Sequence, residues 1–158
     1  MMLRKLLGTS ILLLIGVLSA RRSVHAEKER EALLDAWIRL LYEIRTEIDC
    51  FSLPIQEILA RTDRQVLQRL GADEPPDSLA SLYRLRKDDL DPDTSRLLTS
   101  LIGEIGSCYR DEQVKRCDYY LAQLEKGRQE LRARLPVRIK LSMTLSLCLS
   151  LGGAILLW

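Results

Sequence analysis

The sequence predicts an all-α protein: an antiparallel helical bundle flanked by N-terminal and C-terminal transmembrane helices. The chain of 158 residues has only 8 glycines, 5 prolines and 5% aromatic residues, too little turn chemistry for a many-stranded β fold. Leu141–Trp158 is an uncharged segment whose helix would reach ~27 Å, close to the thickness of a bilayer. Two further stretches repeat apolar residues at alternating steps of three and four. We therefore expect an anchor at 1–24, a bundle at 25–140 and a second span at 141–158.

Basic residues precede the C-terminal segment. They are Lys126, Arg128, Arg132, Arg134, Arg138 and Lys140. Because basic flanks stay on the cytoplasmic side of a membrane, the bundle is predicted to be cytoplasmic and the C-terminus to lie across the membrane.

The N-terminal apolar run, Leu6–Ala20, has two interpretations. Its length fits a signal peptide, and Val24, His25 and Ala26 offer small-residue cleavage spacing. Arg21 and Arg22 favour a retained span instead, because positive residues directly after an apolar run stop transfer. Retention also places ten nearby Lys and Arg residues inside and two outside. We therefore predict two retained spans, with a cleaved signal peptide as the alternative.

The long helices of the bundle are predicted from two heptad seams. The first, on 27–49 and just beyond, comprises Leu34, Trp37, Leu41, Ile44, Ile48 and Phe51. The second, on a helix that Asp111 opens, comprises Val114, Cys117, Leu121, Leu124, Arg128, Leu131 and Leu135. Such seams are typical of long helices packed against each other, and Pro136 falls where the second helix meets the predicted span.

Three shorter helices are predicted between the long ones. Pro54 begins a helix that runs to Leu70 and is capped by Gly71. Asp77 or Ser78 caps a helix through Leu79–Leu85, and Asp93 caps a helix over Thr94–Ile105 that ends at Gly106. The acidic run 88–93 lacks the glycine and terminal glutamate of a calcium loop, so capping explains it better than metal binding.

Motifs for catalysis and for cofactor binding are missing from the sequence. It has no phosphate-binding loop, no nucleophile elbow and no HExxH, and His25 is the only histidine. The cysteines form no CxxC pair, which argues against a metal site. The net charge of +2 gives no reason to expect nucleic acid, and the basic excess near the spans is expected to meet membrane lipid. We predict no enzymatic activity, no cofactor and no small-molecule substrate.

Small residues recur along the two predicted spans. Those on one face are Gly16 and Ala20 in the first span, and Ser142, Ser146, Ser150 and Ala154 in the second. This pattern allows close helix approach within a membrane, so these residues are candidates for transmembrane packing. The alternative is that the serines bond back to their own helix.

Two segments resemble a known family. They are "LLYEIRTEIDCFSLPIQEIL" at 40–59 and "LIGEIGSCYRDEQ" at 101–113. Together with the terminal apolar segments and Gly152-Gly153, they resemble the stage III sporulation protein AB family of endospore-forming bacteria. The residues that carry the match are Glu43, Glu47, Leu53, Pro54, Glu57, Ile105, Gly106 and Asp111–Gln113.

The resemblance implies a scaffold in the mother-cell membrane around the forespore. The cytoplasmic bundle would be similar to the platform component of type II secretion and type IV pilus systems. The implied partners are other stage III sporulation membrane subunits and a cytoplasmic motor ATPase. If so, the candidate contact residues lie at the helix turns far from the spans: Pro54, Glu57, Arg110 and Asp111.

Two rival classes stay open from the sequence. One is an outward-facing, tail-anchored adaptor with a signal peptide, in which Cys50 would pair with Cys108 or Cys117. The other is a membrane enzyme that uses carboxylates, which would need paired Asp or Glu in a cleft.

Overall fold

The computed structural model describes the backbone of residues 2–106 and 109–157, and side chains mainly over 25–106 and 109–134. Within these residues the chain is all α, with no strand. The elements are α1 (Met2–Phe51), α2 (Ile55–Arg61), α3 (Arg64–Arg69), α4 (Leu79–Leu85), the 3-10 turn η1 (Lys87–Asp89), α5 (Pro92–Glu104) and α6 (Arg110–Leu157). The predicted fold class is confirmed at this level.

The chain divides into two compact units. One comprises residues 30–130 and is a helical bundle; the other comprises residues 1–29 and 131–158, the outer parts of α1 and α6. In the part of the chain that is described, no helical stretch is long and apolar enough to cross a membrane. The predicted spans at 1–24 and 141–158 consist mostly of side chains outside the described residues, as do all six predicted transmembrane packing residues.

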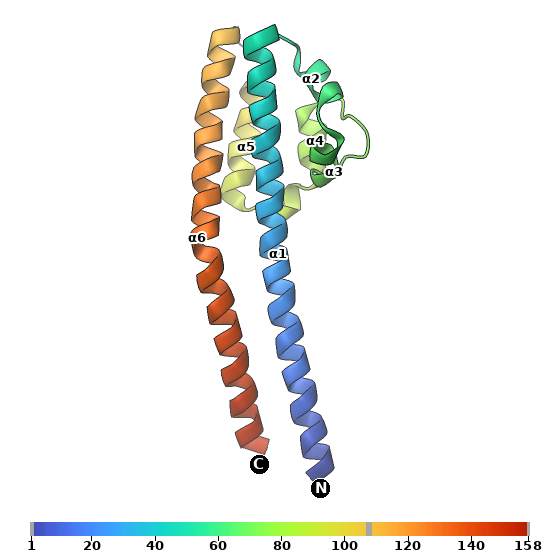
Figure 1. The fold of residues 1–158 in the computed structure, drawn as a ribbon, viewed down its shortest axis with the longest axis vertical. Helices are drawn as coiled ribbons and strands as arrows, with labels where there is room; N and C mark the ends of the chain where they lie inside the picture. The colour runs from blue at the N-terminus through green and yellow to red at the C-terminus, as the bar shows by residue number, and fades with distance from the viewer. Residues whose placement is uncertain (1, 107–108, 158) are drawn as a thin grey trace. The chain divides into compact units, whose positions relative to one another are not determined.

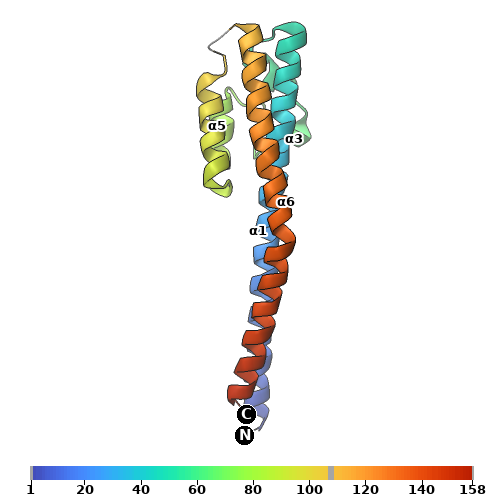
Figure 2. The ribbon, with the colours of Figure 1, turned by 90° about the vertical axis from the view of Figure 1, so that its left-hand side faces the viewer.

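Within the bundle, α1 and α6 lie side by side and antiparallel (Figure 1, Figure 2). Three polar contacts define this register. Asp35 pairs with Arg128 at 3.0 Å, Tyr42 donates to Glu125 at 2.8 Å, and Arg45 pairs with Asp118 at 2.9 Å. The α6 partner moves back along the chain as the α1 residue advances, as an antiparallel pair requires. The predicted antiparallel pairing of the long helices is confirmed for this unit.

The buried face of α1 is wider than the heptad seam predicted for it. Its buried α1 residues are Leu33, Leu34, Ala36, Trp37, Ile38, Leu40, Leu41, Ile44 and Ile48. A helix covered by the shorter helices as well as by α6 needs this broader apolar face. Phe51 was predicted on the seam, but it is 67% exposed because α1 ends there.

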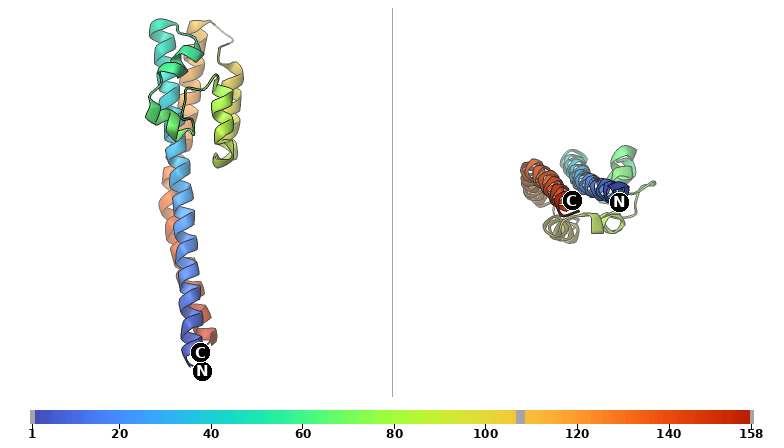
Figure 3. Two further views of the ribbon diagram at one scale, coloured as in Figure 1. Left: turned by 90° about the vertical axis from the view of Figure 1, so that its right-hand side faces the viewer. Right: turned by 90° about the horizontal axis from the view of Figure 1, so that it is seen from below.

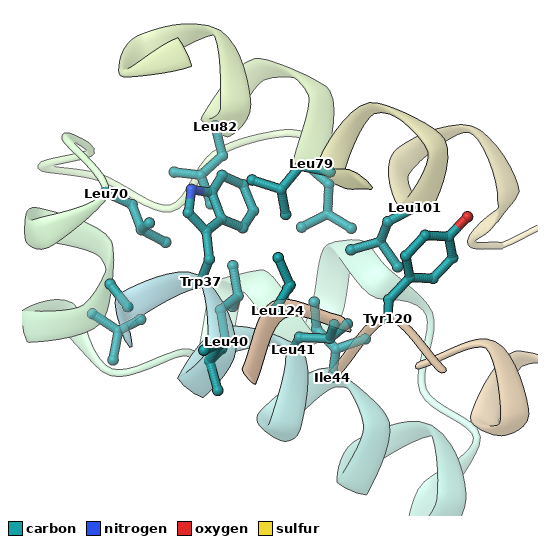
Figure 4. Packing of buried hydrophobic residues seen from close by; sticks show 14 of the residues in the cluster. Trp37, Leu40, Leu41, Ile44, Leu70, Leu79, Leu82, Leu101, Tyr120 and Leu124 are labelled. Atoms are coloured by element: carbon teal, nitrogen blue, oxygen red, sulfur yellow. The ribbon is translucent and has the colours of Figure 1, made fainter. Parts of the chain in front are cut away.

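The shorter helices close the core from the other side. Figure 3 shows two views of α2 to α5 around the α1 and α6 pair. Figure 4 shows Trp37 pointing from α1 toward Leu82 and Leu79 of α4, and Tyr120 of α6 beside Leu101 of α5. Burying one large apolar side chain in this way contributes about 1.5–3 kcal/mol.

The predicted single helix 54–70 is wrong, because the chain breaks at Thr62 and Asp63. The Thr62 hydroxyl donates to the Ile58 carbonyl, and the Asp63 carboxylate accepts from the Gln65 amide at 2.9 Å, which caps α3. Short polar side chains compete in this way with helical backbone bonds. The predicted cap at Gly71 is confirmed: its φ of +91° lets the amide of Ala72 reach the Leu67 carbonyl at 2.9 Å.

The cap of α4 was predicted as Asp77 or Ser78, and the cap of α5 as Asp93. Ser78 caps α4 in a reciprocal box with Ser81. The cap of α5 is Asp91 rather than Asp93, since its carboxylate accepts from the amide of Thr94 at 3.0 Å. Pro92 explains the shift, because proline is favoured at the first helical position and needs no amide partner there.

The last helix begins at Arg110, one residue before the predicted start at Asp111, and continues through Pro136. Of its predicted seam, Cys117, Leu121 and Leu124 are buried, and Val114 packs against the core from a partly buried position. The side chain of Leu135 lies outside the described residues.

Candidate functional site

A groove of about 480 Å³ lies where the helix turns of the bundle meet. We call this the turn groove. Its lining residues are Ile48, Ser52, Leu53, Pro54, Ile55, Gln56, Gly106, Arg110 and Gln113. They come from the end of α1, the start of α2, the end of α5 and the start of α6, so four chain segments build one concave surface.

Two left-handed residues bend the chain around the groove. Ser52 follows the last residue of α1 with a φ of 54°, and its amide donates to the Ile48 carbonyl at 3.1 Å. Gly106 has a φ of 89° after α5. Glycine adopts this conformation freely, whereas a residue with a Cβ is strained by about 1–2 kcal/mol. Ser52, the residue that carries this strain, is therefore itself part of the groove lining.

The side chains that line the groove are mostly apolar or neutral. Among the described residues that line the groove, Arg110 is the one with a charge, and its Nη2 lies 3.2 Å from Asp49 Oδ1. Arg45 also pairs with Asp49, at 3.4 Å. The Arg110 charge is therefore already shared with α1, and the apolar residues Ile48, Leu53 and Ile55 determine what the groove can hold.

Exposed aromatic side chains adjoin the groove in the chain. Phe51 precedes Ser52 and is 67% exposed, and Tyr109 precedes Arg110 and is 91% exposed. Single exposed apolar residues are common, but two aromatics beside an apolar groove are typical of a contact surface.

The structure brings together two of the four predicted contact residues, since Pro54 and Arg110 both line the groove. Glu57 lies one residue after the lining and pairs with Arg61, while Asp111 is exposed in the first turn of α6. Sequence reasoning missed Ser52, Gln56 and the exposed aromatics. The one sequence feature that could have identified these residues is their position next to the predicted turns.

Two glutamates of α1 precede the groove lining in the chain. Glu47 is next to the lining residue Ile48, and Glu43 lies one helical turn before it. Burial raises the pKa of Glu43, and the negative charges of Asp63 and Glu47 raise it further.

The cysteines differ in their surroundings. Cys50 is exposed and Cys117 is buried, and both are free thiols. Burial raises the pKa of Cys117 to about 11, with a smaller contribution from Asp118. Cys108, the other predicted pairing residue, lies outside the described residues. In the described part of the chain, no group of three or more His, Cys, Asp or Glu residues could hold a metal ion.

Comparisons with protein-family models, curated proteins and solved structures found no match to this chain. The arrangement of its own residues therefore carries the functional argument. That arrangement is a concave apolar surface with exposed aromatics, which is suited to holding a partner.

Proposed function

We propose that this chain is a membrane-anchored scaffold subunit, with its bundle in the cytoplasm and both ends across the membrane. Following the resemblance in the sequence, the complex is the secretion-like channel between mother cell and forespore. Its partners are other stage III sporulation membrane subunits and a cytoplasmic motor ATPase, and its site is the mother-cell membrane around the forespore.

The observation that carries the proposal is the turn groove with its exposed neighbours Phe51 and Tyr109. A protein that works by contact needs surface that its own fold leaves uncovered, and aromatic residues are enriched in such surfaces. In chain order, the turns that build the groove lie between the two helix ends predicted to enter the membrane. A cytoplasmic partner could reach them there.

The distribution of charge supports the anchored topology. Ten Lys and Arg residues near the predicted spans fall on the bundle side and two on the other side. This bias orients membrane helices with the bundle inside the cell. Anionic lipid at the cytoplasmic surface would add to the attraction.

The proposal is tested by charge reversal at the groove end. Asp111→Lys changes an exposed acidic residue in the first turn of α6. The matched control is Asp93→Lys, an exposed acidic residue in the first turn of α5, so both variants alter the same helix-dipole interaction. We expect only Asp111→Lys to reduce co-purification of the ATPase with the membrane complex, because surface charges set complementarity more than stability.

Equal co-purification with both variants and with the native chain would argue against a docking role for this end of the bundle. Leu121→Asp serves as the unfolding control, because Leu121 is 4% exposed and an unpaired charge there would break the core.

An outward-facing adaptor is the second candidate. The fifteen-residue length of Leu6–Ala20 and the small residues around His25 favour it. Mass spectrometry of the purified protein separates the two: a mature chain that begins near Glu27 would support the adaptor, and a retained N-terminal segment would support the scaffold.

A further inference from the structure

We propose that α6 contains a hinge at residues 127–136, where the bundle gives way to the outer part of the helix. The hinge allows the outer part of α6 to change its direction, while α1 passes the same boundary as a continuous helix. This inference goes beyond the proposed scaffold role, because it follows from the backbone and the burial of α1 and α6. It rests on a glycine, a proline and a lack of buried side chains.

The hinge crosses the boundary between the two compact units of the chain, which falls after residue 130 on α6 and before residue 30 on α1. Leu124 is 1% exposed, and Arg128 pairs with Asp35 at 3.0 Å, so α6 is held in the bundle up to the start of the hinge. Beyond Leu124, none of the described α6 side chains is buried. A segment with few buried contacts is one that opens locally at low cost.

Gly127 weakens the inner end of the hinge without a packing reason. Among the described residues, a Cβ at this position would meet nothing within 4 Å outside its own stretch of helix. Its φ is not positive, unlike that of Gly71 and Gly106. Neither a close neighbour nor a left-handed backbone therefore requires glycine here. Glycine in a helix interior is less stable than alanine, because it loses more conformational freedom on folding.

Pro136 weakens the outer end of the hinge, since it lies inside α6. Proline has no amide, so position 136 cannot donate the helical hydrogen bond to the carbonyl four residues earlier, and its ring crowds that carbonyl. Proline is accordingly a common cause of kinks in long helices. The two weak positions lie on either side of the boundary between the units.

The first helix lacks these features where it crosses the same boundary. Residues 27–36 of α1 contain neither glycine nor proline, and nine of the ten are Glu, Lys, Arg, Ala or Leu, which are strong helix formers. Leu33, Leu34 and Ala36 are also buried in the bundle core. The two long helices therefore differ in local stability at this boundary, and bending is confined to α6.

Hydrogen exchange of the full chain in nanodiscs tests the local stability. The amides of 128–135 should exchange roughly tenfold faster than those of 27–36, because fewer buried contacts protect them. The double variant Gly127→Ala, Pro136→Ala should slow exchange at 128–135 by roughly tenfold or more and leave 27–36 unchanged. The matched control is Gly103→Ala, at a glycine of α5 whose Cβ would also meet nothing within 4 Å. It should leave exchange at 128–135 unchanged.

Spin-label distances test the bending itself. On a cysteine-free background, labels at Lys115→Cys and Lys140→Cys report the distance along α6, and labels at His25→Cys and Thr46→Cys report it along α1. All four positions are exposed. We expect a broad distance distribution for α6, a narrow one for α1, and a narrowed α6 distribution in the double variant. Circular dichroism checks that each variant keeps its helical content.

Two results would overturn the inference. One is equal exchange of 128–135 and 27–36 in the native chain. The other is an α6 distance distribution that is as narrow in the native chain as in the double variant. Neither result bears on the proposed function, which fails separately if Asp111→Lys leaves ATPase co-purification intact.

Discussion

Arg128 Nη1 of α6 donates to Asp35 Oδ1 of α1 at 3.0 Å, across 93 residues of sequence. Both side chains are about a quarter exposed, and Arg128 Nε is buried with no hydrogen-bond partner in the described part of the chain. The residue that interrupts the apolar seam of α6 is thus a cation held by a carboxylate of the neighbouring helix.

The first prediction concerns this pair. Arg128→Met and Asp35→Leu should each destabilise the fold by about 1–3 kcal/mol, because each removes this ion pair from the partly buried charge that stays behind. The double variant should cost less than the sum of the single ones, since it leaves neither charge behind. Urea unfolding of all four proteins gives the coupling energy. Additive effects would mean that the pair does not couple α1 to α6.

The second prediction concerns pH. The pKa of Glu43 is raised in the fold, chiefly by burial, so its ionised form costs stability above that pKa and the cost disappears as the pH falls through it. Glu43→Gln should therefore be more stable than the native chain at about pH 7, and the difference should shrink toward about pH 4. Thermal unfolding across this range measures it. If the native chain were more stable than Glu43→Gln at neutral pH, the raised pKa of Glu43 would be contradicted.

The third prediction compares two left-handed residues. Gly71→Ala should destabilise the fold by about 1–2 kcal/mol, because of its positive φ. Its new Cβ would also lie 3.1 Å from Arg86 Cγ. Ser52→Gly should instead stabilise it by roughly 0.5 kcal/mol, as relief of strain exceeds the added chain entropy. Chemical denaturation reports both, and a destabilised Ser52→Gly would mean that the serine side chain supports the turn.

The fourth prediction concerns thiol reactivity. Iodoacetamide should modify exposed Cys50 in the native protein and spare Cys117, whose pKa burial raises to about 11. Peptide mass spectrometry after labelling distinguishes the two sites, and both should react in denaturant. Rapid native modification of Cys117 would show that the α1 and α6 interface opens readily.

The sequence predicted the parts of the fold that depend on local pattern. The apolar periodicities of α1 and α6, the Ser78 cap and the glycine stop at Gly71 all appear in the structure. The break at Thr62 and Asp63 was not predicted from the sequence. Apolar residues continue through it at helical spacing, and the competing hydrogen bonds come from two short side chains.

The site was predictable only in outline. Pro54 and Arg110 marked the right turns, since proline and a helix start are visible in sequence. The left-handed Ser52 carried no such signal, because serine is an unusual residue in that conformation. The pairing of Arg110 with Asp49 depends on a contact between residues 61 positions apart, which no local pattern encodes.

Cysteine accessibility in cells tests the central claim, that the bundle is anchored on the cytoplasmic side of a membrane, most directly. A variant with Cys108→Ser and Cys148→Ser leaves exposed Cys50 as the reactive thiol, since Cys117 is buried. With the chain produced in a non-sporulating host, whose cytoplasmic membrane faces the medium, a membrane-impermeant maleimide should leave it unlabelled in intact spheroplasts and label it in inverted membrane vesicles. Labelling of Cys50 in intact spheroplasts would contradict the account and place the bundle outside the cytoplasm.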